Sequence, residues 1–304
     1  MLRVLITGAT GFIGSHIADS LVKSNYEVIA LKRENSDCWR CEEINDKIKW
    51  INLDEEGQWK KVVIRYNPEV FIHSAWIGVE AHERDNIKTQ IKNIDFLTDL
   101  LEIAKELKIR KFVNLGSQAE YGCIDGKVNE SFNANPTTTY GSVKLASLEI
   151  FKTFCIQHNI NWVWLRLFSF FGEKECRNWL IPALIQRMQE SNEMDFTPGL
   201  QKYAYLYVKD LGEITNRMIS QPIDSGIYNV SSNQAITLKV LIEKIRDKIA
   251  PTFKLNFGAL SYRENQSMHI EGDSSKLINQ LGEIQLTDFD QALNSTIEYY
   301  ISNK

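Results

Sequence analysis

Three regularly spaced glycines follow an apolar run at the start of the chain. Residues 2–6 have the pattern of a strand, and Gly8, Gly11 and Gly14 lead into an amphipathic helix. Gly8 permits a tight turn, Gly11 lets the backbone approach a pyrophosphate at the helix N-terminus, and Gly14 lets the helix pack close to the strand. This spacing predicts a β-α-β unit that binds a dinucleotide. The other residues of the turn that we expect to contact it are Thr10, Phe12 and Ile13.

The following sequence alternates between strand-like and helix-like patterns. The expected strands are residues 27–31, 70–73, 111–115 and 162–167, and the long amphipathic segments are residues 86–107 and 138–158. This alternation is typical of the α/β class. It predicts a doubly wound parallel sheet of the Rossmann type with helices on both faces.

The pattern becomes less regular after about residue 170. Helical periodicity is found at residues 179–190, 211–220 and 238–249, and short strand patterns at residues 203–207, 227–230 and 253–255. We expect these elements to form a smaller α/β lobe over the carboxyl edge of the sheet, where such folds bind ligands. The sequence thus predicts a dinucleotide-binding domain at residues 1–169 and a substrate-binding lobe at residues 170–304, part of which returns to the main domain.

Charge and composition exclude several classes of protein. The 304 residues carry 35 Lys and Arg against 39 Asp and Glu, a net charge of −4, so neither nucleic acid nor a membrane is an expected partner. The apolar runs are too short to cross a bilayer, and Met1 leads into a strand rather than a signal peptide. Five scattered cysteines fit a reducing compartment, so we expect a cytoplasmic protein. Cys38 and Cys41 have no second pair at zinc-site spacing, so no metal is expected.

A second motif, far downstream, has the residue types of a proton-transfer site. Tyr140 and Lys144 stand four residues apart in an expected helix and therefore share one face. An ammonium group beside a phenol stabilises the phenolate and brings its pKa toward neutral pH. Ser117 follows the expected strand at residues 111–115, so its hydroxyl leaves the carboxyl end of a central strand. We expect Ser117 to bond a substrate oxygen while Tyr140 exchanges a proton with it.

Together these motifs resemble the extended short-chain dehydrogenase/reductases, the group of nucleotide-sugar epimerases, dehydratases and reductases. The resemblance covers essentially the whole chain, and it implies that Ser117, Tyr140 and Lys144 are the catalytic triad and that Lys144 also holds the nicotinamide ribose. His73 has an alternative role, because a histidine that ends a buried strand is typically packed against its neighbours or hydrogen-bonded to the backbone. The matching segments are residues 8–14, 73–75, 93, 117, 140–144, 166–172 and 207–210. The further cofactor contacts are Asn52, Leu53, His73, Ala75, Asn93 and Phe168.

Where this chain differs from the family pattern, the differences disfavour some of the family's reactions. Family members that dehydrate sugars have an acidic pair where this chain has Gln118 and Ala119, and an amide or a methyl group cannot replace an acid or a base. The related decarboxylases have Glu at the position of Ala119, and the epimerase-reductases of the deoxyhexose branch have Cys there. All three reactions are disfavoured unless Glu120 reaches into the site. A reductase or a 4-epimerase remains.

The end of the second expected strand bears on the cofactor. Relatives that bind NAD have an Asp there for the ribose hydroxyls, whereas this chain has Lys32 and Arg33. Two cations favour a 2′-phosphate, so we expect NADP, with NAD possible if both are only surface charges. We therefore favour NADPH-dependent reduction of a nucleotide-linked 4-keto-6-deoxyhexose. The alternatives are a nucleoside-diphosphate-hexose 4-epimerase and a non-catalytic NADP-sensing protein, which normally lacks the tyrosine and lysine.

The resemblance also implies where the substrate nucleotide binds. It would lie against residues 177–182 and the strand around Tyr205, and Ser169 stands where much of the family has Asn. The expected substrate contacts are Gln118, Ser169, Asn178, Tyr205 and Arg263. Since the family commonly pairs through two long helices, here around residues 91–107 and 148–154, we expect a homodimer.

Overall fold

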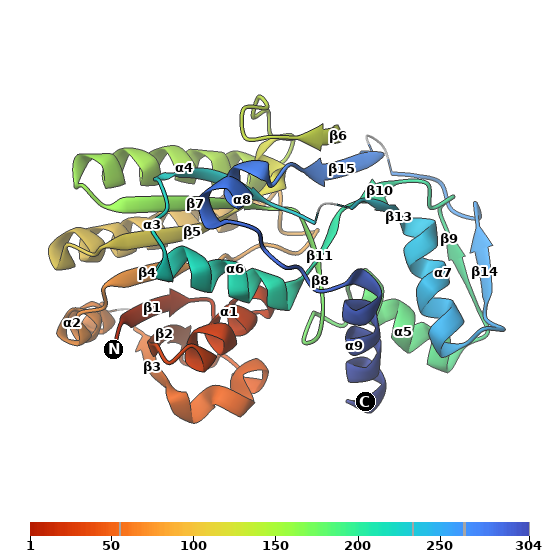
Figure 1. The fold of residues 1–304 in the computed structure, drawn as a ribbon, viewed down its shortest axis with the longest axis horizontal. Helices are drawn as coiled ribbons and strands as arrows, with labels where there is room; N and C mark the ends of the chain where they lie inside the picture. Colours follow the sequence, from red (N-terminus) through yellow and green to blue (C-terminus); the bar gives the residue numbers. More distant parts are fainter. Residues whose placement is uncertain (55, 233, 264–265, 304) are drawn as a thin grey trace.

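A sheet of seven parallel strands is the centre of the structure, a computed structural model that describes residues 1–54, 56–232, 234–263 and 266–303. The strand order is β12-β7-β5-β4-β1-β2-β3 (Figure 1). The expected α/β class with a doubly wound parallel sheet is therefore confirmed. The strands are β1 Arg3–Thr7, β2 Glu27–Arg33, β3 Ile48–Leu53, β4 Val70–His73, β5 Lys111–Ser117, β7 Asn161–Leu167 and β12 Gly226–Val230.

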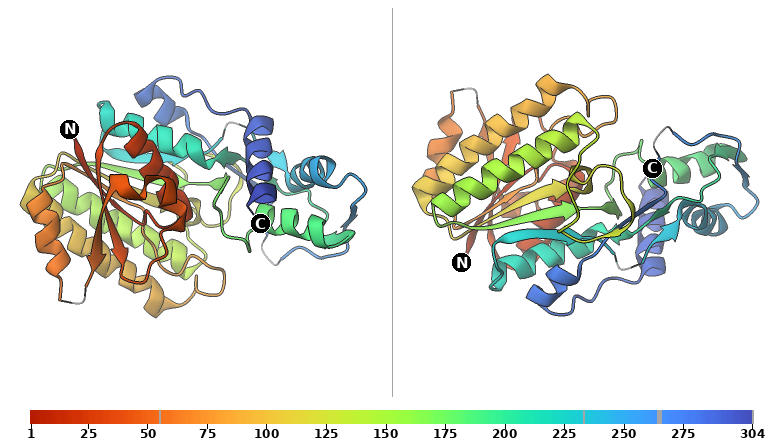
Figure 2. Two further views of the ribbon diagram at one scale, coloured as in Figure 1. Left: turned by 90° about the horizontal axis from the view of Figure 1, so that it is seen from below. Right: turned by 90° about the horizontal axis from the view of Figure 1, so that it is seen from above.

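Helices cover both faces of this sheet. In both views of Figure 2, α6 and α8 lie on one side and α3 and α4 on the other. Because the strands are buried on both faces, neighbouring side chains enter different cores: Ile6 packs in the core that contains α1 and α6, and Leu5 packs in the core that contains α3 and α4. These helices are α1 Phe12–Lys23, α2 Gln58–Tyr66, α3 Ile87–Leu107, α4 Thr139–Gln157, α6 Val208–Ser220 and α8 Ser275–Leu281.

The strand order reverses between β1 and β4, which creates the point where sheets of this type bind ligands. Gly8 follows β1 with a φ of 75°, and a Cβ placed on it would lie 2.6 Å from the backbone nitrogen of Ala75, which follows β4. A Cβ on Gly14 would lie 2.1 Å from the Gly8 carbonyl oxygen. The glycines therefore let three backbone segments meet at this point.

A smaller lobe lies beyond the carboxyl ends of the strands, at the right of Figure 1. Its core contains Leu184 of α5, Leu241 of α7 and Leu293 of α9. Its elements are β8 Ser169–Phe171, α5 Leu180–Glu190, β9 Glu193–Phe196, β10 Lys202–Tyr203, β11 Tyr205–Tyr207, β13 Ile236–Thr237, α7 Leu238–Ile249, β14 Lys254–Phe257, β15 His269–Gly272 and α9 Phe289–Ser302. The remaining elements are the short helices η1 Trp39–Lys47 and η2 Gln118–Glu120 and the strand β6 Asp125–Val128.

The strand expected at residues 203–207 is two strands in the structure. β10 pairs with β13 and β15, whereas β11 pairs with β8. The buried Ala204 between them donates its amide hydrogen to the Ile270 carbonyl at 3.2 Å. The sequence pattern is continuous because residues 203–207 are all aromatic or aliphatic, but the chain changes sheets at Ala204.

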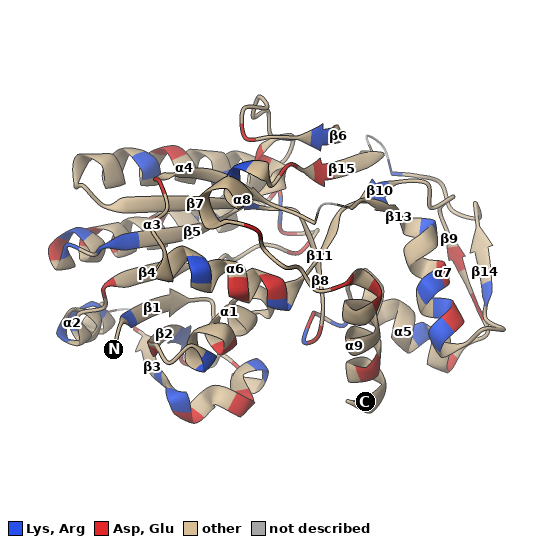
Figure 3. Cartoon of the chain, in the orientation of Figure 1, with Lys and Arg blue, Asp and Glu red and all other residues tan. Residues whose placement is uncertain are grey.

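Charges of both signs are distributed over the helices and loops, and the strands of the main sheet are largely uncharged (Figure 3). Within the described ranges, no helix has both the length and the apolar character that crossing a membrane requires.

Candidate active site

Ser117, Tyr140 and Lys144 come together at the carboxyl end of β5. Ser117 is the last residue of β5, and α4 brings Tyr140 and Lys144 to it. The first turn of α4 packs closely on η2, since a Cβ on Gly141 would lie 2.4 Å from the Ala119 carbonyl oxygen. The hydroxyl of Thr138 caps α4 by accepting a hydrogen bond from the Gly141 amide at 3.1 Å. The start of α4, and with it Tyr140, is thus fixed against the end of the central strand.

The Ser117 hydroxyl is oriented by its own turn. Its oxygen accepts a hydrogen bond from the Ala119 amide at 3.2 Å. Because a hydroxyl both accepts and donates, its hydrogen stays available to a substrate oxygen. Gln118 is half-buried on the same turn, next to this hydroxyl.

Tyr140 is held as a neutral phenol. Burial raises its pKa, and the Ser117 side chain and the Arg84 guanidinium oppose this effect. Arg84 lies over the tyrosine ring, with its central carbon 5.3 Å from the ring centroid. The cation that lowers the phenol pKa in this arrangement is therefore Arg84, rather than Lys144 as the sequence suggested. Nothing in the sequence around Arg84 marks it for this position.

Lys144 is almost completely buried, with 4% of its surface exposed. Its ammonium nitrogen donates a hydrogen bond to the Leu115 carbonyl at 2.6 Å and lies 3.6 Å from the centroid of the Trp76 ring. Burial lowers its pKa to about 7, although the Glu120 carboxylate acts in the opposite direction. The ammonium group of Lys144, on α4, is thus held by the Leu115 carbonyl of β5 and by the Trp76 ring, and it is not among the groups that shift the pKa of Tyr140.

Glu120 does not reach into the site. Its carboxylate accepts hydrogen bonds from the Ser117 amide at 2.7 Å, from the Trp164 indole at 3.0 Å and from the Arg166 guanidinium at 2.8 Å. Its side chain is 0% exposed and that of Arg166 is 3% exposed. Glu120 therefore holds the backbone of Ser117 from behind and is turned away from any substrate, so the turn after β5 presents no acidic group there.

The turn between β1 and α1 fits a dinucleotide pyrophosphate. Gly11 makes no side-chain capping bond to α1, which leaves the first amides of the helix for an anion. Among the described residues, a Cβ on Gly11 would meet only the Gly8 carbonyl oxygen, at 3.2 Å, so little surrounds the approach to these amides. The turn places Thr10, Phe12 and Ile13 around this helix start.

The expected adenosine contacts lie side by side at the ends of two strands. In the pairing of β2 with β3, Lys32 stands opposite Asn52 and Arg33 opposite Leu53. Arg33 is exposed, and the half-buried Lys32 donates a hydrogen bond to the Glu34 carbonyl at 3.3 Å. This end of the sheet therefore presents two cations where the ribose of a dinucleotide would be recognised.

His73, Ala75 and Asn93 surround the end of β4. The Nδ1 atom of His73 lies 2.7 Å from the Thr7 hydroxyl, which also accepts the Ala75 amide at 3.2 Å. Burial, with a smaller effect of Lys144, lowers the pKa of His73 to about 3, so the imidazole is neutral. Asn93 bonds both the amide of Ile77 at 2.8 Å and its carbonyl at 3.1 Å. These contacts fix the loop that follows β4.

That loop contributes Trp76, which the sequence analysis did not single out. Its ring lies nearly perpendicular to that of Tyr140, at 84° with 6.0 Å between centroids, in addition to its contact with Lys144. A tryptophan next to Ala75 has no distinctive spacing. Only the tertiary structure reveals that it touches both catalytic candidates.

The expected substrate contacts come from two parts of the fold. Ser169 of β8 stands opposite Tyr205 of β11, so these two are brought together. Arg263 is exposed near Tyr203, where its charge counteracts the rise that burial causes in the pKa of Tyr203. Asn178 is exposed in the loop before α5. These residues belong to the smaller lobe, whereas Gln118 begins η2, directly after β5 of the main sheet.

Phe168, the remaining expected cofactor contact, is 8% exposed and packs among apolar side chains. It contacts Tyr121 with 6.3 Å between ring centroids. A Cβ on Gly272 would lie 2.5 Å from the Phe168 ring. The ring therefore closes the small core between β6 and β15.

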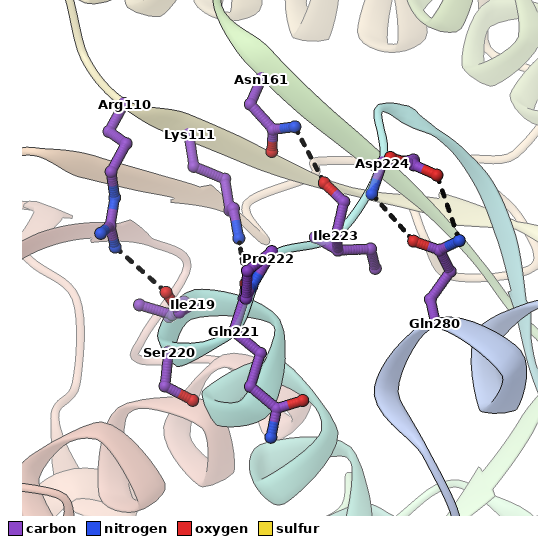
Figure 4. A pocket seen from close by; sticks show the side chains of 10 residues that line it. All are labelled: Arg110, Lys111, Asn161, Ile219, Ser220, Gln221, Pro222, Ile223, Asp224 and Gln280. Atoms are coloured by element: carbon purple, nitrogen blue, oxygen red, sulfur yellow. Dashed lines mark hydrogen bonds between the residues drawn. The ribbon is translucent and has the colours of Figure 1, made fainter.

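A surface hollow lies at the amino ends of the strands, where side chains cap the carboxyl end of α6 (Figure 4). Arg110 donates to the Ile219 carbonyl at 3.0 Å, and Lys111 donates to the Gln221 carbonyl at 3.0 Å, at the carboxyl end of α6. Burial lowers the pKa of Lys111 to about 8. These cations satisfy the last carbonyl groups of the helix. The hollow lies at the amino ends of β5 and β7, away from Ser117.

The possible metal ligands in the part of the chain that the structure describes include the cysteines of the CxxC segment, Cys38 and Cys41. No group of three His, Cys, Asp or Glu side chains is close enough there to hold an ion. Cys41 is buried and donates its thiol hydrogen to the Ala9 carbonyl at 3.1 Å.

Comparison with curated proteins gives relatives that act on nucleotide-linked sugars. CDP-abequose synthase of Salmonella muenchen is 27% identical over 279 residues, which cover 90% of this chain and 90% of the relative. The dTDP-6-deoxy-L-talose 4-dehydrogenase (NAD(+)) of Aggregatibacter actinomycetemcomitans is 24% identical over 275 residues, which cover 89% of this chain and 99% of the relative.

Solved structures share the whole fold. UDP-N-acetylglucosamine 4-epimerase from Methanobrevibacter ruminantium M1, in complex with UDP-N-acetylmuramic acid, has a TM-score of 0.89 at 23% identity and covers 100% of this chain and 99% of that one. UDP-glucuronic acid 4-epimerase from Bacillus cereus, in complex with UDP-glucuronic acid and NAD, has a TM-score of 0.85 at 23% identity over 100% of both chains. Residues 4–231 also match the NAD dependent epimerase/dehydratase family. The chain therefore belongs to this family, the extended short-chain dehydrogenase/reductases, which are enzymes of nucleotide sugars.

Proposed function

We propose that the protein reduces the 4-keto group of a nucleoside-diphosphate-linked 4-keto-6-deoxyhexose with NADPH. The observation that carries the proposal is the neutral phenol of Tyr140 beside the Ser117 hydroxyl. The turn that follows Ser117 contains Gln118 and Ala119 and has no acidic pair at these two positions. A protonated phenol is the form that donates a proton to a ketone oxygen during reduction. Loss of water from the sugar would need an additional acid or base, and Glu120 is bonded away from the site.

In the proposed step, the protein binds the ketone oxygen and supplies a proton to it. The Ser117 hydroxyl donates a hydrogen bond to that oxygen and stabilises the negative charge that develops there. Tyr140 transfers its proton to the same oxygen as the alkoxide forms. The dinucleotide, when bound at the β1–α1 turn, supplies the hydride that the carbonyl carbon receives. Lys144, whose pKa burial lowers to about 7, would hold the nicotinamide ribose.

The names of two relatives support a redox reaction of a nucleotide-linked deoxysugar. One is a dTDP-6-deoxy-L-talose 4-dehydrogenase and the other a CDP-abequose synthase. The second candidate is a 4-epimerase, because the two solved structures described above are 4-epimerases of similar fold. An epimerase oxidises and reduces the same carbon, so it leaves the cofactor unchanged overall.

A panel of nucleotide-linked sugars separates the two candidates. We expect one NADPH to be consumed for each 4-keto-6-deoxyhexose converted, measured by the loss of nicotinamide absorbance and by NMR of the product. Nucleotide-linked hexoses without a keto group should remain unchanged. Interconversion of two 4-epimers at constant absorbance would refute the reductase and establish the epimerase.

Lys32→Asp tests the choice of NADP. Because an ammonium group at a 2′-phosphate forms a charge-assisted hydrogen bond, the variant should raise the KM for NADPH by about 10- to 100-fold. The KM for NADH should stay the same or fall, since a carboxylate suits the ribose hydroxyls. The control is Lys47→Asp, which makes the same charge change at an exposed residue of η1. Equal effects of Lys32→Asp on both dinucleotides would contradict a preference for NADP.

A further inference from the structure

We propose that Trp76 is a positioning residue of the reaction centre, whose indole ring holds the Lys144 ammonium group and the Tyr140 ring in place. The inference rests on the proposed function in taking Tyr140 and Lys144 as the catalytic pair. It adds a residue from a third part of the chain, the loop between β4 and α3.

Trp76 provides the main partner of the Lys144 ammonium group besides one carbonyl. The nitrogen lies 3.6 Å from the ring centroid and donates to the Leu115 carbonyl at 2.6 Å. The face of an indole ring attracts a cation, and the attraction is larger where water is excluded. Lys144 is 4% exposed, so this contact is made where water is largely excluded.

Tyr140 is held between Trp76 and Arg84, two residues of the same loop. The Trp76 and Tyr140 rings meet at 84° with 6.0 Å between centroids, an edge-to-face contact. Arg84 lies over the Tyr140 ring at 5.3 Å, and its carbonyl accepts the Tyr140 amide at 2.8 Å. The four side chains therefore form a continuous row of contacts, from the Lys144 ammonium group through the Trp76 indole and the Tyr140 phenol to the Arg84 guanidinium. In this row, Trp76 connects the two catalytic candidates.

The indole ring is itself fixed by buried hydrogen bonds. Its nitrogen donates to the Gln90 side-chain oxygen at 2.9 Å. Gln90 is 0% exposed, and its amide nitrogen donates to the Gly78 carbonyl at 2.7 Å. Gly78 has a φ of 77°, and a Cβ there would lie 2.5 Å from that amide nitrogen. The loop is thus tied to α3, so Trp76 has the rigidity that a positioning residue needs.

The charged and titratable neighbours of Lys144 define what a titration would report. Glu120 lies on η2 and favours the ammonium form, whereas burial disfavours it. His73 at the end of β4 is neutral, and Tyr140 on α4 is a neutral phenol. A change at Trp76 alters none of these charges. A downward shift in the titration of Lys144 would therefore report the loss of the ring, because water that entered its place would shift the titration upward.

The experiment compares Trp76→Phe, Trp76→Leu and Trp76→Met in the full-length protein. The lysine side chains are followed by 13C NMR against pH without added cofactor, and Lys144→Met identifies the signal of Lys144. We expect Trp76→Met, whose long apolar side chain fills most of the space of the indole, to lower the Lys144 midpoint by about one pH unit, because the cation loses its ring. Trp76→Leu leaves more space for water, which would oppose this shift by reducing the burial of Lys144. Trp76→Phe, which keeps a ring, should give a smaller shift. Val79→Ala, at an exposed residue of the loop, should give none.

Kinetics with a 4-keto sugar provide the second readout. Trp76→Leu should lower kcat about tenfold or more and leave the KM for the sugar within about twofold, and Trp76→Phe should recover most of the loss. A folded Trp76→Leu or Trp76→Met protein with an unshifted Lys144 midpoint and normal kcat would overturn the inference. A shifted midpoint in a protein that reduces no keto sugar would support the role of Trp76 and refute the proposed function alone.

Discussion

Tyr140→Phe is expected to lower turnover by about two to four orders of magnitude, while the affinity for the dinucleotide stays nearly unchanged. The substitution removes only the hydroxyl that donates the proton. The ring contacts with Trp76 and Arg84 remain, because neither requires the hydroxyl oxygen. The β1–α1 turn lies on a different strand and is not altered. The measurements are steady-state kcat by loss of NADPH absorbance and dinucleotide affinity by calorimetry.

Ser142→Ala is the matched control for this experiment. Ser142 is an exposed residue of the same helix, and its hydroxyl donates a hydrogen bond to the Thr138 carbonyl at 3.1 Å. Its removal should leave kcat within about twofold of the original value. If Tyr140→Phe retained full activity, Tyr140 would not be the proton donor, and the proposed step would have to be abandoned.

Arg166→Met should destabilise the protein strongly, with a loss of about 3 kcal/mol in the free energy of unfolding. The substitution leaves the Glu120 carboxylate buried without its cation, and both side chains are almost fully buried, at 3% and 0% exposed. The Ser117 amide and the Trp164 indole still donate to Glu120, so the loss is partial. Urea unfolding at pH 7 measures it.

The double variant Glu120→Gln/Arg166→Met identifies the cause. Without a buried charge, it should be more stable than Arg166→Met alone by about 1 kcal/mol or more. The comparison pair is Arg217 with Glu213, a largely exposed ion pair of α6 with 3.2 Å between the charged atoms. Arg217→Met should cost less than about 1 kcal/mol. An equal loss for Arg166→Met and Arg217→Met would show that burial of the pair does not matter.

The parts of the fold that repeat a local pattern could be predicted from the sequence. The alternation of apolar strands and amphipathic helices gives β4 and α3 almost residue for residue. Pairing between distant segments has no such local pattern. This is why residues 203–207 read as one strand although Tyr203 and Tyr205 belong to different sheets. It is also why the sequence patterns gave no strand at β6 or β15, which are short and pair with each other.

The candidate site likewise contains residues that the sequence predicts and residues that it does not. Ser117, Tyr140 and Lys144 could be found because strand ends and helical spacing place them predictably. The residues that surround them could not be found, because their positions depend on tertiary contacts. Trp76 reaches the site through a loop tied to α3, and Arg84 through its contact with α4. The order of the residues along the chain contains no information about either contact.

The place of β12 in the main sheet has a consequence for synthesis of the chain. Its five residues, Gly226–Val230, pair with β7 although much of the smaller lobe lies between them in the sequence. A ribosome that has released β7 must add α5, β9, β10, β11 and α6 before the edge of the sheet can close. Until then β7 exposes unpaired backbone groups that other chains can bind. A nascent chain that stalls after residue 169 would therefore need a chaperone to stay soluble.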